Sequence, residues 1–163
     1  MDIHGYSVSS SALISGYSRS HMLLEEELSN FLGQEKTLLY STGYQANLGV
    51  IKSLVSRGSF IFADQLNHAS LIDGSILSRA NFKRYEHKNI KELDVLLNKC
   101  PDSRDKLIIS DSLFSMDGDL AELKELEQRL KKYEAKLLID EAHSLGVFGY
   151  QGRGLVFLSL IHI

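Results

Sequence analysis

The chain has 163 residues, 24 % of them charged, and a formal net charge of −3 at pH 7. This length suits a single domain, and the mild acidity gives no electrostatic reason to expect a nucleic-acid partner. No apolar run reaches the roughly 18 residues of a membrane span, and the lone Cys100 excludes an internal disulfide and a cysteine-based zinc cage. We therefore expect a cytoplasmic protein without membrane, nucleic-acid or metal partners.

Strand-like and helix-like segments alternate along the chain. An apolar helical stripe from Leu23 to Leu32 is followed by Gly33, a residue typical of helix ends. The elements expected after it are a strand at 36–41, a helix at 43–56, a strand at 59–64, a helix at 69–79, a weaker strand at 82–85, a helix at 90–97, a strand at 107–109, an amphipathic helix at 120–133 and a strand at 137–140. Continuously apolar strands alternating with helices predict an α/β fold, with three layers (α/β/α) around a mostly parallel sheet.

An acid and an imidazole follow the last of these strands. Asp140-Glu141-Ala142-His143 comes directly after three aliphatic residues, and open α/β sheets bind ligands at the carboxyl ends of their strands. One class of helicases carries this motif, and so do enzymes that use pyridoxal 5′-phosphate (PLP). A helicase also needs a phosphate-binding loop with Gly-Lys-Ser or Gly-Lys-Thr. No glycine here is followed by lysine, which disfavours the helicase.

Three segments carry groups that PLP would need. Ser41-Thr42-Gly43-Tyr44 precedes a predicted helix, whose N-terminal amides suit a phosphate, although a simple helix cap is the plainer interpretation of this segment alone. His68 lies past a strand end and offers a flat ring, although by itself it would be interpreted as a capping or surface histidine. Asp140 would keep a pyridine nitrogen protonated, and burying such an acid without a partner is costly.

Six blocks of sequence, in one order, resemble the α-oxoamine synthases, which are PLP-dependent enzymes of fold type I related to the class II aminotransferases. The similarity covers about residues 5–154. The blocks are Ser15-Gly16-Tyr17-Ser18 with His21, Ser41-Thr42-Gly43-Tyr44-Gln45-Ala46-Asn47, Asn67-His68-Ala69-Ser70, Phe114-Ser115-Met116-Asp117-Gly118-Asp119, Asp140-Glu141-Ala142-His143 and Gly152-Arg153-Gly154.

The resemblance implies a homodimer that binds PLP and assigns cofactor contacts. His68 would stack on the ring, Asp140 would pair with its nitrogen, and Ser115 and His143 would approach its phenolic oxygen. The cofactor-binding candidates are Thr42, Gly43, Tyr44, His68, Ser115, Asp140 and His143, of which His68, Asp140 and His143 are also the catalytic candidates. The role of His21 stays open, and the aspartates at 117 and 119 are best interpreted as turn residues.

The same resemblance implies a reaction between two small molecules, an amino acid and an acyl thioester, with loss of carbon dioxide. The first block is most similar to the branch that joins L-alanine to a pimeloyl thioester, on coenzyme A or a carrier protein, at the start of biotin ring assembly. Glycine C-acetyltransferases and 5-aminolevulinate synthases share most of the other blocks and are alternatives. A binding domain that kept the scaffold without catalysis is an alternative of another class.

The family's Schiff-base lysine lies beyond the Asp-x-x-His block, and this chain has no lysine after Lys136. We therefore expect residues 1–157 to be part of a transferase large domain that is catalytically incomplete alone. Residues 158–163 match one reading frame of a transposase sequencing adaptor, which predicts a non-native tail. An ordinary apolar strand is the alternative for these six residues.

Overall fold

The structure is a computed structural model that describes residues 10–158. Two compact units divide between Tyr40 and Ser41. The first contains a π-helical turn, η1 (Ala12–Gly16), and helix α1 (Arg19–Leu32). The second contains the sheet and the remaining helices. Of the tail predicted at 158–163, residues 159–163 lie outside the described part of the chain.

In the first unit, α1 ends as its sequence predicts, but it begins at Arg19, four residues before the predicted apolar stripe. Ser18 precedes the helix, and its N–H donates to His21 Nδ1 at 3.2 Å. Gly33 ends the helix in the left-handed conformation, with φ 64°, which glycine adopts without a steric cost.

The strand predicted at 36–41 is wrong. Within the described residues this segment pairs with no strand. The N–H of Leu39 donates instead to Glu25 Oε1 at 3.0 Å, and Ser29 Oγ donates to Thr37 Oγ1 at 3.0 Å. A side chain of α1 therefore satisfies a main-chain N–H that a neighbouring strand would satisfy in a sheet.

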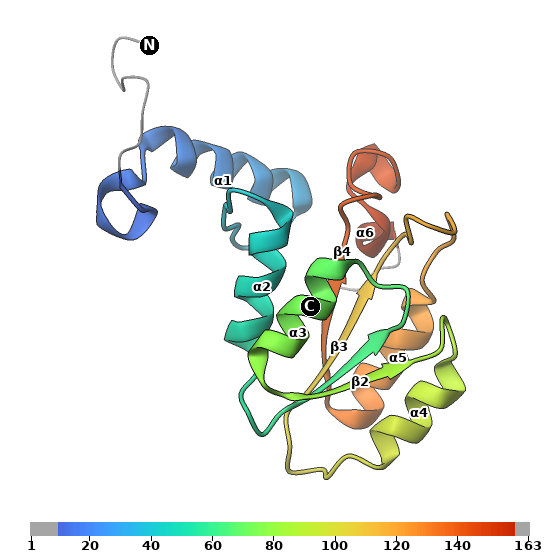
Figure 1. Ribbon diagram of the computed structural model, residues 1–163. Helices are drawn as coiled ribbons and strands as arrows, with labels where there is room; N and C mark the ends of the chain where they lie inside the picture. The colour runs from blue at the N-terminus through green and yellow to red at the C-terminus, as the bar shows by residue number, and fades with distance from the viewer. Residues whose placement is uncertain (1–9, 159–163) are drawn as a thin grey trace. The chain divides into compact units, whose positions relative to one another are not determined.

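The second unit is built on a parallel sheet with the strand order β2-β1-β3-β4 (Figure 1). The strands are β1 (Phe60–Asp64), β2 (Asn81–Tyr85), β3 (Lys106–Asp111) and β4 (Lys136–Asp140). The helices are α2 (Gly43–Leu54), α3 (Ala69–Ser78), α4 (Ile90–Asn98), α5 (Leu123–Tyr133) and α6 (Leu155–Leu158), with a short 3₁₀ turn η2 (Tyr150–Gly152). This confirms the predicted α/β fold with a parallel sheet.

Apolar side chains leave the central strands alternately toward the two faces of the sheet. One face packs against α2 and α3, through Ile61, Ala63, Leu107, Ile109, Ile51 and Leu71. The other face packs against α4 and α5, through Phe62, Ile108, Leu93, Leu97, Leu123 and Leu126. The central strands β1 and β3 carry continuous apolar runs, as expected for strands that are buried on both faces, and the two helix layers are visible in Figure 1.

The predicted amphipathic helix begins three residues later than expected, at Leu123. Leu120 forms an isolated antiparallel bridge with Leu113 instead. This bridge closes the turn that contains Gly118, whose φ of 71° favours glycine. The apolar periodicity was continuous through Leu120, so it could not mark the point at which the turn ends.

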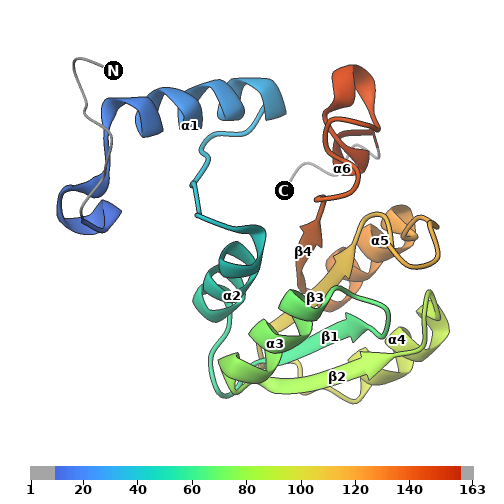
Figure 2. The same ribbon diagram turned by 45° about the horizontal axis from the view of Figure 1, so that its top comes forward.

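The order in which the chain adds strands to the sheet reverses after β2. Strand β2 lies on one side of β1, whereas β3 and β4 lie on the other side. Such a reversal opens a crevice at the carboxyl ends of the strands, where open α/β sheets bind ligands. Figure 2 shows the twist of the sheet from β2 to β4.

Candidate functional site

An open cleft lies at the carboxyl ends of β3 and β4. Its walls come from the start of α2, the start of α3 and the turn after β4. The residues that line it are Gly43, Tyr44, Asn47, His68, Ser70, Asp111, Asp140, Ala142 and His143. The structure thus brings together five of the residues singled out from the sequence, although they are up to 100 positions apart.

The N-terminus of α2 supplies one wall. Thr42 precedes the helix, and its Oγ1 accepts from the N–H of Gln45 at 3.1 Å, so this residue is a helix cap. A Cβ at Gly43 would meet no atom within 4 Å. The helix therefore begins beside open space, with first-turn amides that have no partner within the helix.

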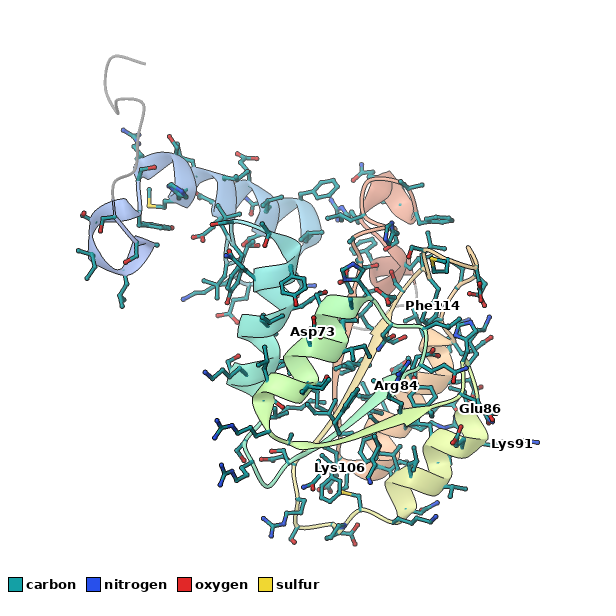
Figure 3. All side chains as sticks on the ribbon, in the orientation of Figure 1. Asp73, Arg84, Glu86, Lys91, Lys106 and Phe114 are labelled. Atoms are coloured by element: carbon teal, nitrogen blue, oxygen red, sulfur yellow. The ribbon has the colours of Figure 1, made fainter. Side chains whose placement is uncertain are left out.

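Tyr44 is held in place by the neighbouring helix. Its hydroxyl donates to Asp73 Oδ2 at 2.5 Å, and Figure 3 shows Asp73 on α3. The hydrogen bond to Asp73 raises the pKa of the Tyr44 hydroxyl, with a further contribution from burial. The tyrosine therefore stays neutral at the edge of the cleft.

Asp140 ends β4 with both carboxylate oxygens bonded. Oδ2 accepts from Asn47 Nδ2 at 2.7 Å, and Oδ1 accepts from the N–H of Ala142 at 2.9 Å. The residue is half-buried. Two N–H donors thus offset part of the cost of withdrawing this carboxylate from water.

His68 immediately precedes α3 and is exposed. Its Nδ1 lies 2.7 Å from Ser70 Oγ and accepts from the N–H of Ser70 at 3.3 Å. The histidine is therefore a helix cap whose ring also lines the cleft. The two interpretations offered by the sequence are compatible at this position.

Asp111 is a second carboxylate at the cleft, and the sequence analysis missed it. It ends β3 directly beside Asp140 and is 4 % exposed. Its Oδ2 accepts from the N–H of His68 at 2.7 Å. Burial raises the pKa of Asp111 to about 6, the hydrogen bond from His68 opposes this rise, and the charge of Asp140 adds to it. The signal that identified Asp140, an acid closing a buried apolar strand, was present here too.

Asn47 and Ser70 also escaped the sequence analysis as site residues. Asn47 Nδ2 donates to Ser70 Oγ at 2.9 Å as well as to Asp140. Asn47 and Asp140 are 93 positions apart, and no spacing pattern in a single sequence indicates such a contact. Asn47 and Ser70 each lie in one of the six family-like sequence blocks, close to residues that were predicted to contact the cofactor.

Two cofactor candidates differ in placement. His143 is exposed and lines the cleft, whereas Ser115 is exposed on the turn after β3 and is not among the lining residues. Their approach to a phenolic oxygen stays a prediction.

His21, in the first unit, caps α1 with Ser18, its Nδ1 lying 2.8 Å from Ser18 Oγ. This is a satisfied polar contact, with Ser18 as the partner. It indicates a local structural role for His21.

A charged cluster fixes the turn that follows β3. Asp119 Oδ2 lies 3.0 Å from His87 Nε2 and 3.0 Å from Lys88 Nζ. His87 Nδ1 lies 3.0 Å from Asp64 Oδ1 at the end of β1, and the His87 ring contacts Phe114 edge-on with centroids 4.5 Å apart. Figure 3 shows Phe114 at the opposite end of β3 from Lys106. These contacts give Asp119 a structural role in the turn.

Metal clusters and membrane-spanning helices are both absent from the described part of the chain. Over residues 10–158, no three or more His, Cys, Asp and Glu side chains gather as a metal site would require. Within the same residues, no helix has both the length and the apolar character needed to cross a bilayer.

Comparison with known proteins gives consistent matches. The model of the class I and II aminotransferase family matches residues 7–159. The 8-amino-7-oxononanoate synthase of Nitrosospira multiformis is 50 % identical over 151 residues, which cover 93 % of this chain and 38 % of that protein. The present chain thus spans about two fifths of the length of this relative.

Solved structures agree with this result. A serine palmitoyltransferase of Sphingomonas wittichii has a TM-score of 0.93 at 38 % identity, covering 97 % of this chain and 40 % of the other. A serine palmitoyltransferase variant of S. paucimobilis, solved with bound PLP and myriocin, has a TM-score of 0.91 at 37 % identity, covering 95 % and 39 %.

Proposed function

The chain belongs to the class I and II aminotransferase family and, within it, to the α-oxoamine synthases, and we propose that it forms the PLP-binding part of an 8-amino-7-oxononanoate synthase. The observation that carries this proposal is the meeting of the α2 N-terminus, His68 and Asp140 in one cleft. These groups match the phosphate, the flat ring and the pyridine nitrogen of PLP. The family itself is PLP-dependent.

The residues present fit the cofactor. The open space at Gly43 and the first-turn amides of α2 suit a phosphate dianion, which a helix N-terminus stabilises. Asp140 presents a carboxylate oriented by two donors. The exposed ring of His68 offers a flat surface. When bound, PLP acts as an electron sink for negative charge that develops on the amino-acid substrate.

The chain's own residues would position the cofactor and keep its pyridine nitrogen protonated. Asp140 would accept a hydrogen bond from the protonated pyridine nitrogen, and Asn47 and Ala142 would hold the carboxylate still. His68 would cover one face of the ring and exclude water from it. Tyr44, tied to Asp73, would border the ring. Thr42 would act through the helix that it caps, and Ser115 and His143 would approach the phenolic oxygen.

The proposed reaction joins L-alanine to a pimeloyl thioester, carried by coenzyme A or by a carrier protein, with loss of carbon dioxide. The 50 % identity to an 8-amino-7-oxononanoate synthase supports these substrates. Glycine C-acetyltransferase and 5-aminolevulinate synthase chemistry are the alternatives. We further propose a cytoplasmic homodimer, and that a lysine outside this sequence completes the site.

PLP affinity tests the binding site. In the native protein that carries this chain, Asp140→Asn should weaken binding of PLP to the cofactor-free form by about 10- to 100-fold, the value of a hydrogen bond between charged groups. Asp102→Asn is the matched control, because Asp102 is exposed and lies outside the cleft. Equal affinity for PLP in the wild type and the Asp140 variant would contradict the assignment.

Release of the free thiol from the acyl thioester tests the substrates, because each candidate reaction expels the thiol whether or not carbon dioxide is lost. The native protein should release the thiol from a pimeloyl thioester with L-alanine faster than from an acetyl or succinyl thioester with glycine. A faster reaction with glycine would instead assign the protein to one of the alternative branches of the family. PLP binding without turnover of either amino acid would favour the non-catalytic binding domain.

A further inference from the structure

We propose that Asn47 and Ser70 are positioning residues that hold the neutral His68 imidazole in its Nε2–H tautomer and connect it to Asp140 through hydrogen bonds. The use of this arrangement in binding PLP rests on the proposed function. The tautomer itself is a property of the chain and can be measured without cofactor.

The connection starts at the side-chain amide of Asn47. Its Nδ2 lies 2.7 Å from Asp140 Oδ2 and 2.9 Å from Ser70 Oγ, so each of its two protons has an acceptor. The reversed amide would place Oδ1 against the carboxylate, two acceptors facing each other without a proton between them. The contact with Asp140 therefore fixes which way the Asn47 amide points.

Ser70 links the oriented Asn47 amide to the imidazole of His68 by hydrogen bonds. A hydroxyl has one proton and two lone pairs, so Ser70 Oγ can accept from Asn47 and still direct its proton to His68 Nδ1 at 2.7 Å. The backbone N–H of Ser70 also donates to Nδ1, at 3.3 Å. A nitrogen that accepts from two donors cannot carry a proton itself, so the proton of the neutral ring resides on Nε2.

The burial of Ser70 stabilises these hydrogen bonds. Ser70 is 1 % exposed, so water cannot readily replace either of its hydrogen bonds. Asp111 adds a further constraint, because it accepts from the main-chain N–H of His68 at 2.7 Å. The ring that would cover the cofactor is thus held at its Nδ1 edge and at its backbone.

Nitrogen-15 NMR of histidine-labelled native protein tests the proposal directly. At a pH where His68 is neutral, the spectrum should show an unprotonated Nδ1 and a protonated Nε2. Ser70→Ala should reduce the preference for this tautomer by about fivefold, the value of one neutral hydrogen bond. Ser78→Ala is the matched control on the same helix, because Ser78 Oγ bonds to the carbonyl of Ser75.

A protonated Nδ1 in the wild type would overturn the proposal, even if the variant failed to fold. A wild-type histidine spectrum in Ser70→Ala would also overturn it. Because the measurement requires no PLP, failure of the wild type to bind PLP would count against the proposed function alone. If both proposals hold, Ser70→Ala should also weaken PLP binding, whereas Ser78→Ala should not.

Discussion

Removing the charge of Asp111 should stabilise the folded protein at neutral and alkaline pH. Burial raises the pKa of this carboxyl from 3.8 to about 6, so its ionised form is disfavoured in the folded state. Asp111→Asn removes the ionisation and keeps an oxygen that can accept from the N–H of His68. The variant isolates the electrostatic cost of the buried charge.

The size of the effect follows from the two pKa values. A difference of about 2 pKa units corresponds to about 3 kcal/mol between the protonation states. The pKa is raised on folding, so the favourable contribution of the protonated carboxyl is complete below about pH 3.8. It is lost as the pH rises to about 6. Between about pH 4.5 and pH 8, the stability of Asp111→Asn relative to the wild type should therefore rise by about 2 kcal/mol.

Urea unfolding of the two proteins at these two pH values measures this change. Comparing the two pH values cancels any constant loss from a poorer hydrogen bond to His68. A carbon-13 titration of the Asp111 carboxyl provides a second measurement. The reasoning would be refuted if the stability difference did not vary with pH, or if Asp111 titrated near its ordinary value.

Three further changes test other parts of the fold. Gly154→Ala should cost more than about 1 kcal/mol in urea unfolding, because φ is 93° and its Cβ would lie 2.5 Å from the Glu141 carboxylate; unchanged stability would contradict this. Thr42→Ala should cost about 1 kcal/mol by the same assay and Thr42→Ser much less; equal losses would show that the cap is unimportant. Burial alone would lower the pKa of His87, but its bonds to two aspartates raise it. The stabilising contribution of His87 should therefore be complete below about pH 6.5 and decline above it, so the loss in His87→Gln should be larger at low pH.

The sheet and its helix layers were predictable because the physics that forms them is local. The strands at 107–109 and 137–139 are apolar at every residue, which is typical of strands covered on both faces. The helix from Leu123 to Tyr133 carries its apolar residues at helical spacing. These patterns identify an element without knowledge of its neighbours.

The strand predicted at 36–41 shows where local patterns fail. Apolar residues there match a strand, but a strand also needs a partner, and the N–H of Leu39 is bonded to the Glu25 carboxylate instead. Asp111 could have been found, since the pattern that drew attention to Asp140 is repeated at the end of β3. The bonds of Asn47 to Asp140 and Ser70 could not, because they depend on how two helices meet β4.

The paired ends of β3 and β4 have a consequence for the direction in which a ligand can bind. Asp111 and Asp140 place two carboxyl groups at one side of the cleft, whereas Gly43 begins a helix whose amides favour an anion. Asn47, which contacts Asp140, lies about one helical turn beyond Gly43, a rise of about 6 Å along the axis. The cleft is therefore an electrical dipole of molecular size. A ligand with an anion at one end and a cation at the other should therefore bind with its anion toward the start of α2 and its cation toward the ends of β3 and β4.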